Sequence, residues 1–128
     1  MRVAIQSDKI PAPRFRYSPC VKIGNTYHVS GMIGLDYATG KLAAGGVGEE
    51  TKVILANLLQ ALPDYGLSLD ELLVARIFTT KFEEFAAINA AWEAVFSEET
   101  IPPARTSVGV SALPLGAAVE IEFTFIKA

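Results

Sequence analysis

Two short stretches near the N-terminus, at residues 19–23 and 26–31, have the pattern of β-strands. In the second stretch tyrosine and valine alternate with histidine and serine, and this period of two predicts a strand with one apolar and one polar face. Gly24-Asn25 lies between the two stretches, and this pair indicates a hairpin turn. Residues 3–6 are a further candidate strand.

The period changes after Glu49, where apolar residues recur at helical spacing: Leu55, Leu58, Leu59 and Leu62. Because proline removes a backbone donor and restricts the residue before it, Pro63 is expected to end or kink this helix near Leu62. A second helix is predicted from about residues 82–84 onward. One side of it carries Phe85, Ile88, Asn89, Trp92, Val95 and Phe96.

Three further strands are predicted in the second half of the chain, at residues 73–80, about 104–111 and 117–126. Pro102-Pro103 forces an extended start to the second of them, and a turn is expected at residues 113–116. The resulting order is strand-strand-helix-strand-helix-strand-strand, with no repeat or linker. We therefore predict a single α/β (α+β) domain over residues 1–128, in which two helices cover one face of a single mixed β-sheet.

The last strand divides its residues between two faces: apolar at Val119, Ile121, Phe123 and Phe125, and mixed at Ala118, Glu120, Glu122, Thr124 and Ile126. If the last two strands pair through a loop with an even number of residues, Arg105 shares the mixed face with Glu120 and Glu122. An odd number would put its guanidinium in the apolar layer, which requires a partner for the charge. We interpret the mixed face as a wet site or a subunit contact.

The loop length also sets how far apart these charges lie along such a hairpin. A four-residue loop at 113–116 pairs Arg105 with Thr124 and leaves Glu120 about 13 Å away along the strand. A two-residue loop pairs Arg105 with Glu122 and reduces the separation to about 7 Å. For the longer loop, our hypothesis is that a neighbouring subunit completes a site for a small ligand.

The composition limits the classes of protein to which this chain can belong. Of its 128 residues 51% are hydrophobic and 20% charged, the mean hydropathy is +0.33, and no run of about 18 apolar residues occurs. Disorder, a membrane span and an N-terminal signal peptide are therefore not expected, and we predict a cytoplasmic protein. So high an apolar content in a short chain also indicates a buried subunit interface.

Charge and residue counts exclude further classes. The net charge is −3 and the basic residues are scattered, apart from Arg14 and Arg16 beside Phe15, which argues against nucleic acid as a partner because phosphate binding needs a basic surface. Cys20 is the only cysteine and there is one histidine. We therefore expect no disulfide framework and no cysteine-based metal site.

Short motifs occur in a fixed order from about residue 10 to the C-terminus: Tyr17-Ser18-Pro19, Gly24-Asn25, Val29-Ser30-Gly31, Phe85-Ala86-Ala87-Ile88-Asn89, Pro103-Ala104-Arg105, Leu113-Pro114 and Val119-Glu120-Ile121-Glu122. Together they resemble the reactive intermediate deaminase (RidA/YjgF) family. The resemblance implies a chorismate-mutase-like fold, a homotrimer with a ligand cleft between neighbouring subunits, and no cofactor or metal. It also implies hydrolysis of enamine and imine intermediates of the 2-aminoacrylate type to 2-keto acids and ammonia, the reaction of a 2-iminobutanoate/2-iminopropanoate deaminase.

A 2-imino acid carries a carboxylate beside an electrophilic carbon, and two residues of these motifs suit the two groups. Arg105 offers a planar fork that grips a carboxylate through two charge-assisted hydrogen bonds. Water must attack the imine carbon, and the resemblance assigns Glu120 to orienting or deprotonating that water. The resemblance further implies substrate-binding roles for Tyr17, Ser30, Gly31, Asn89 and Ser107.

Several of these residues also fit a purely structural role. Arg105 is a candidate ion-pair partner of Glu122, and glutamates that alternate along a strand are ordinary on a solvated face. Tyr17 fits a subunit interface as well as a ligand contact. Ser30 fits the end of a strand.

The chain also departs from the family pattern, with Phe15-Arg16 where Gly-Pro is common before the tyrosine, Met32 for glutamine and Ser107 for cysteine. These departures leave the size and charge of the substrate open. Two other functions are therefore considered. One is non-catalytic binding of small keto acids or related metabolites in the same cleft. The other is endoribonuclease or translation-inhibitor activity, against which the acidic charge balance argues.

Overall fold

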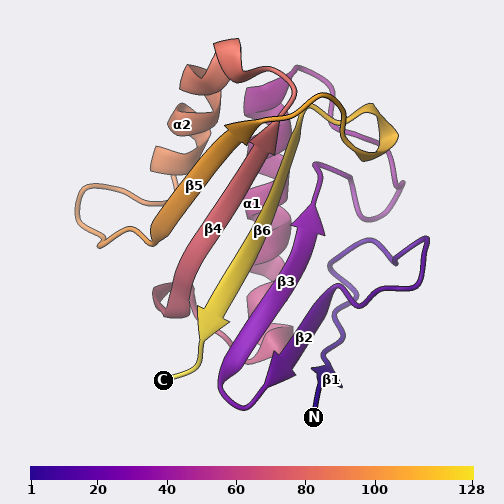
Figure 1. Cartoon of the computed structure of the whole chain (residues 1–128), viewed down its shortest axis with the longest axis vertical. Coiled ribbons are helices and arrows are strands. Elements are labelled where there is room, and N and C mark those ends of the chain that lie inside the picture. Colours follow the sequence, from indigo (N-terminus) through magenta and orange to yellow (C-terminus); the bar gives the residue numbers. More distant parts are fainter.

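Six strands form one mixed sheet in the computed structural model, which describes residues 1–128, and both α-helices lie on one face of that sheet (Figure 1). The strands are β1 (Val3–Ala4), β2 (Cys20–Ile23), β3 (Thr26–Met32), β4 (Leu72–Thr79), β5 (Ala104–Gly109) and β6 (Val119–Ile126). The helices are α1 (Val47–Tyr65) and α2 (Phe85–Glu93), and short 3-10 turns occur at Leu69–Glu71, Phe82–Glu84 and Pro114–Gly116. The predicted elements and the fold class of one mixed sheet with two helices are confirmed.

The strand order β1-β2-β3-β6-β4-β5 explains why both helices share a face. Strands β3 and β4 both run antiparallel to β6, so they are parallel to each other and α1 connects them. Strands β4 and β5 are parallel neighbours joined through α2. Because both crossovers step in the same direction across the sheet, right-handed connections put both helices on the same side.

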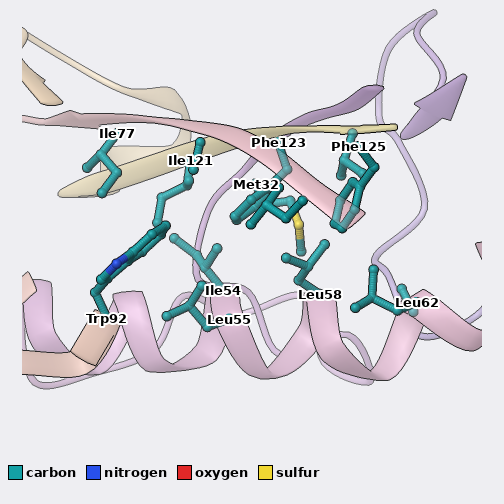
Figure 2. Close-up of a cluster of buried hydrophobic side chains, with 14 of the residues drawn as sticks. Met32, Ile54, Leu55, Leu58, Leu62, Ile77, Trp92, Ile121, Phe123 and Phe125 are labelled. Atoms are coloured by element: carbon teal, nitrogen blue, oxygen red, sulfur yellow. The ribbon is translucent and has the colours of Figure 1, made fainter. Parts of the chain in front are cut away.

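The core lies between the sheet and these helices (Figure 2). The predicted apolar face of β6 is confirmed, because Val119, Ile121, Phe123 and Phe125 are all fully buried. Figure 2 shows Phe123 and Phe125 pointing from the sheet toward Leu58 and Leu62 of α1, and Trp92 of α2 pointing toward the sheet. The period-two pattern of the strand and the 3.6 pattern of the helices therefore meet in one apolar layer.

The prediction that the first helix ends near Leu62 is wrong. Helix α1 continues through Pro63 and ends at Gly66, which has the left-handed φ of 71°. The Leu67 and Gly66 amides donate to the carbonyls of Leu62 and Pro63 and close the last turn. Proline is tolerated here because it removes only one hydrogen bond, to the Leu59 carbonyl, in a turn that the glycine already terminates.

The expected pairing of the last two strands is also wrong, because β4 lies between β5 and β6. Arg105 is the neighbour of Ala75, and Ala75 is the neighbour of Phe123, so all three belong to the helix-covered face. Glu120 is the neighbour of Phe78 and belongs to the opposite face. The segment before β6 therefore crosses the end of β4 and forms no hairpin (Figure 1). Neither hairpin separation predicted from the loop length applies.

The face of the sheet that carries no helix, hereafter the open face, mixes charged and apolar side chains as the alternation in β6 predicted. Its exposed apolar residues are Ile23, Val108 and Ile126. The Glu122 carboxylate lies 3.5 Å from an Arg76 guanidinium nitrogen and 3.7 Å from the His28 ring. Neither helix is long and apolar enough to cross a membrane.

Candidate functional site

The carboxylate of Glu120 lies against a glycine on the open face. Two residues of β3, Ser30 and Gly31, fall in a register shift between Val29 and Met32, the mark of a β-bulge. A Cβ atom on Gly31 would stand 2.7 Å from Glu120 Oε2, which is too close for two non-bonded atoms. A larger residue at this position of the bulge would therefore force the Glu120 side chain away from its place.

The surroundings of Glu120 raise the pKa of its carboxyl group above the ordinary value. Partial burial is the larger cause, because it disfavours the charged form, and the negative charge of Glu122 on the same strand adds to it. A carboxyl group with a raised pKa exchanges protons closer to neutral pH than an ordinary glutamate does. Such a group, at the wall of a cavity, fits the chemistry of a general base.

A cavity of about 920 Å³, hereafter the Glu120 cavity, opens beside this carboxylate and brings together Tyr17, Ser30, Gly31 and Glu120. Residues from the segments before β2, after β3 and before β6 complete its wall. The Ser30 hydroxyl donates a hydrogen bond to the Ser18 carbonyl at 2.7 Å. Its proton is therefore committed within the protein, and its oxygen can accept a hydrogen bond from a ligand.

Arg105 lies in a second cleft of about 900 Å³, hereafter the Arg105 cleft, on the helix-covered side at the edge of the sheet. Its Nη2 donates to Asn89 Oδ1 at 2.8 Å, and its guanidinium carbon stands 5.3 Å from the ring centre of Phe85 and 5.1 Å from that of Trp92. These contacts supply the partners that a guanidinium needs near an apolar layer. Burial lowers the pKa of Arg105, and the charge of Glu93 opposes this shift.

The proposed ion pair between Arg105 and Glu122 is wrong, because the Glu122 carboxylate lies beside Arg76 and His28 on the other face. Within one chain, Arg105 and Glu120 therefore point away from each other. Ser107 shares the face of Arg105, where it neighbours Ile77, and it lines neither of the two cavities.

The sequence pattern placed Phe85 and Trp92 on one side of the second helix, but their contact with the Arg105 guanidinium was not predicted. The sequence did indicate that these side chains lie together, because Phe85, Asn89 and Trp92 follow one another at spacings of four and three and so share one face of a helix. The structure gathers no group of three or more histidine, cysteine, aspartate or glutamate side chains that could hold a metal ion. We assign no residue to a metal or cofactor.

The fold is that of a small α+β domain with a cleft on each side of one sheet. A sequence profile of the family described as Endoribonuclease L-PSP matches residues 7–126. The chain is 35% identical to a RutC family protein of Aquifex aeolicus, over 96% of this chain and 98% of that protein. It is 34% identical to the 2-iminobutanoate/2-iminopropanoate deaminase of Mus musculus, over 95% and 89% of the two chains.

Solved structures of similar proteins have the same fold as this chain. RidA from an Antarctic Psychrobacter superposes with a TM-score of 0.89 at 35% identity, covering 97% of this chain and 98% of that one. TdcF of E. coli, solved with bound serine, superposes with a TM-score of 0.91 at 27% identity, covering 98% and 99%. The chain belongs to the YjgF/RidA/RutC family, and the resemblance read from its motifs is confirmed.

Proposed function

We propose that the protein hydrolyses reactive 2-imino acids of the 2-aminoacrylate type to 2-keto acids and ammonia. The observation that carries this proposal is the Glu120 carboxylate, whose pKa is raised and which lies against Gly31 in the wall of a cavity large enough for a substrate. Two further findings support it. Relatives at 34% identity are named imine deaminases, and a relative of the same fold binds serine, which carries the same carboxylate beside a nitrogen-bearing carbon.

Glu120 acts in this proposal as the base for water and as the acid for the departing amine. Starting from the protonated imine, the oxygen of water bonds to the carbon, the C=N π electrons move to nitrogen, and Glu120 accepts the released proton. The proton then passes from Glu120 to the nitrogen of the carbinolamine. The C–N bond breaks, its electron pair leaves on ammonia, and the hydroxyl proton passes to solvent as the carbonyl forms.

Arg105 binds the substrate carboxylate through its planar fork. Asn89 is a positioning residue, since its side-chain oxygen holds one guanidinium nitrogen at 2.8 Å and so fixes the direction of the fork. The Ser30 oxygen and the Tyr17 hydroxyl offer hydrogen bonds at the Glu120 end, while Gly31 and Ser107 offer backbone groups. The hydroxyl proton of Ser30 is committed to Ser18, so its oxygen suits the N–H of an imine.

Because Arg105 and Glu120 lie on opposite faces of one sheet, a complete site requires two copies of the chain. We propose a homotrimer in which the Glu120 cavity of one subunit meets Arg105 of the partner subunit. Two features favour it. Strand β5 is an edge strand, so a neighbour can approach Arg105 from outside, and the open face carries exposed apolar side chains that association would bury.

The direct test is the lifetime of 2-aminoacrylate released by a serine dehydratase. The wild-type protein is expected to accelerate its decay, and Glu120→Gln to reduce kcat/KM about 100-fold or more through the loss of the base. Gly31→Ala is expected to give a similar loss with an unchanged circular dichroism spectrum, because its methyl group displaces the carboxylate.

Each alternative outcome would contradict a different part of the proposal. Binding of pyruvate without faster decay of the imine would replace hydrolysis by simple binding of keto acids. Cleavage of RNA that survives purification and disappears in Glu120→Gln would replace it by endoribonuclease activity. Faster decay that is unchanged in Glu120→Gln would overturn the role of this residue.

The pH dependence of kcat/KM tests why the pKa of Glu120 is raised. Glu120 acts as a base only when ionised, so kcat/KM is expected to fall at pH values below its pKa. Glu122→Gln removes the neighbouring negative charge that helps to raise this pKa. The acid limb of the kcat/KM profile is therefore expected to move to lower pH in Glu122→Gln. Glu49→Gln, on α1 beyond the other face of the sheet, serves as the matched control, and an equal shift in both variants would refute the assignment.

A further inference from the structure

The wall of the Glu120 cavity is far more apolar than a three-carbon imino acid requires. Four large side chains that line it are solvent-exposed: Phe15 at 81%, Tyr17 at 50%, Tyr37 at 47% and Leu115 at 54%. They come from segments far apart in the sequence and converge on one space. Exposed apolar side chains gathered in one concave surface mark a ligand-binding groove, whereas single ones scattered over a surface need no explanation.

The volume of the cavity also favours a ligand larger than a three-carbon imino acid. At about 920 Å³, it lies near the upper end of the range of about 300–1,000 Å³ found for sites that enclose drug-sized ligands. The imine of alanine or serine fills a small part of such a space. In the proposed trimer the partner subunit borders the opening of the cavity, while the apolar wall of this chain still lacks contacts with so small a substrate. A substrate with a large apolar side chain would cover that wall and keep its reacting carbon beside Glu120.

One of these four side chains, that of Leu115, is held at the rim of the cavity by a strained backbone. Leu115 has a φ of 57°, and it is the only non-glycine residue with a positive φ. This left-handed conformation is unfavourable for a residue with a Cβ atom and natural for glycine. Strain of this kind is often retained where a side chain serves a site. A glycine here would relieve the strain and remove the apolar contact.

We propose that the Glu120 cavity receives the side chain of a bulky apolar or aromatic 2-imino acid, with Phe15, Tyr37 and Leu115 as the specificity-determining residues. The inference rests on the proposed imine hydrolysis and names its substrate class. Arg14 also lines the cavity, and it is the one cationic side chain there. An acidic substrate side chain is therefore the competing choice that the test must include.

The test compares imines made in place by amino acid oxidases from phenylalanine, leucine, alanine and glutamate, with semicarbazide trapping the imine that escapes hydrolysis. The value of kcat/KM for the phenylalanine imine is expected to exceed that for the alanine imine about tenfold or more, the smallest effect typical of one additional apolar group in a pocket. In Phe15→Ala and Leu115→Ala this ratio is expected to fall toward one. Leu73→Ala is the matched control, because Leu73 is 55% exposed and does not line the cavity.

Leu115→Gly separates a specificity role from a structural one. The substitution is expected to lower the same ratio while the melting temperature stays equal or rises, because glycine adopts the left-handed backbone without strain. A fall of the melting temperature together with an equal loss on all imines would assign Leu115 a purely structural role and overturn its part in specificity.

The assay outcomes distinguish a failure of the inferred apolar specificity from a failure of the proposed imine hydrolysis. Equal turnover of the alanine and phenylalanine imines, or a preference for the glutamate imine, would refute the apolar specificity and keep the hydrolysis. Absence of turnover for every imine would refute the hydrolysis. In that case calorimetric titration with phenylpyruvate and pyruvate decides the inference: tighter binding of phenylpyruvate that Leu115→Ala abolishes would support the apolar pocket, and equal binding would overturn it.

Discussion

A mixture of Arg105→Ala and Glu120→Gln subunits is expected to recover about a quarter of the wild-type imine hydrolysis, although each variant alone is inactive. In the proposed trimer every site takes its guanidinium from one subunit and its carboxylate from the next. When the two variants assemble at random in equal amounts, half of the positions carry an intact Arg105 and half carry an intact Glu120. The product of the two fractions is about one quarter.

The physical basis of this expectation is the position of the two residues on opposite faces of the same sheet. Arg105 neighbours Ala75 on the helix-covered face, whereas Glu120 neighbours Phe78 on the open face. A sheet is rigid at this scale, because its backbone hydrogen bonds fix the direction of every side chain in the strand. No rotamer change therefore brings both groups of one chain to the same small ligand.

The measurement requires refolding the two variants together, with a different affinity tag on each. The whole mixture is assayed first, and then the species that carries both tags, in which one site of three is intact and about a third of the wild-type activity is expected. The control replaces the Glu120→Gln subunit by the double variant Arg105→Ala/Glu120→Gln, which contributes no guanidinium, and this mixture is expected to stay inactive. If the doubly tagged species shows no recovery, the site lies within one chain. An active monomer, shown by light scattering at the assay concentration, would contradict the shared site directly.

The second large effect is on stability, and it is expected for Phe123→Ala. The Phe123 side chain is fully buried and points from β6 into the layer shared with α1 (Figure 2). Its truncation removes apolar burial and leaves a cavity that the surrounding sheet and helix cannot close. The free energy of unfolding is expected to fall by about 3–5 kcal/mol, a large part of the stability of a domain of this size.

Phe15→Ala is the matched control for this prediction, since it deletes the same atoms from a side chain that is 81% exposed. Its free energy of unfolding is expected to change by no more than about 0.5 kcal/mol. Urea denaturation of both variants at one protein concentration gives the comparison, because association makes stability depend on concentration. Equal losses in the two variants would contradict the assignment of Phe123 to the core.

The positions of the core residues were predictable because they depend on short-range periodicity. The alternation in β6 fixed which of its residues are buried, and the leucine spacing after Glu49 located α1. Neither pattern depends on which strand lies next to which. The end of α1 was misjudged because Pro63 acts over one turn only, while the actual stop is the left-handed Gly66, four residues beyond Leu62.

The sequence brought together several residues that are neighbours in the structure, but it did not give their arrangement across the sheet. Tyr17, Ser30, Gly31 and Glu120 do share one cavity, and Arg105 and Asn89 do contact each other. The expectation that Arg105 shares a face with the glutamates failed because it assumed that strands adjacent in sequence are also adjacent in the sheet. Strand β4, which precedes β5 in the chain, lies between β5 and β6.

The sequence by itself determined the helices and strands and the buried side of β6 and α1, because these follow from local periodicity. Only the tertiary structure decided on which side of the sheet each charged group stands. That choice depends on the crossover through α2, which carries β5 past β4 to the edge and turns Arg105 toward Asn89, away from Glu120. Strand neighbours are set by packing over the whole chain, and no local pattern encodes them.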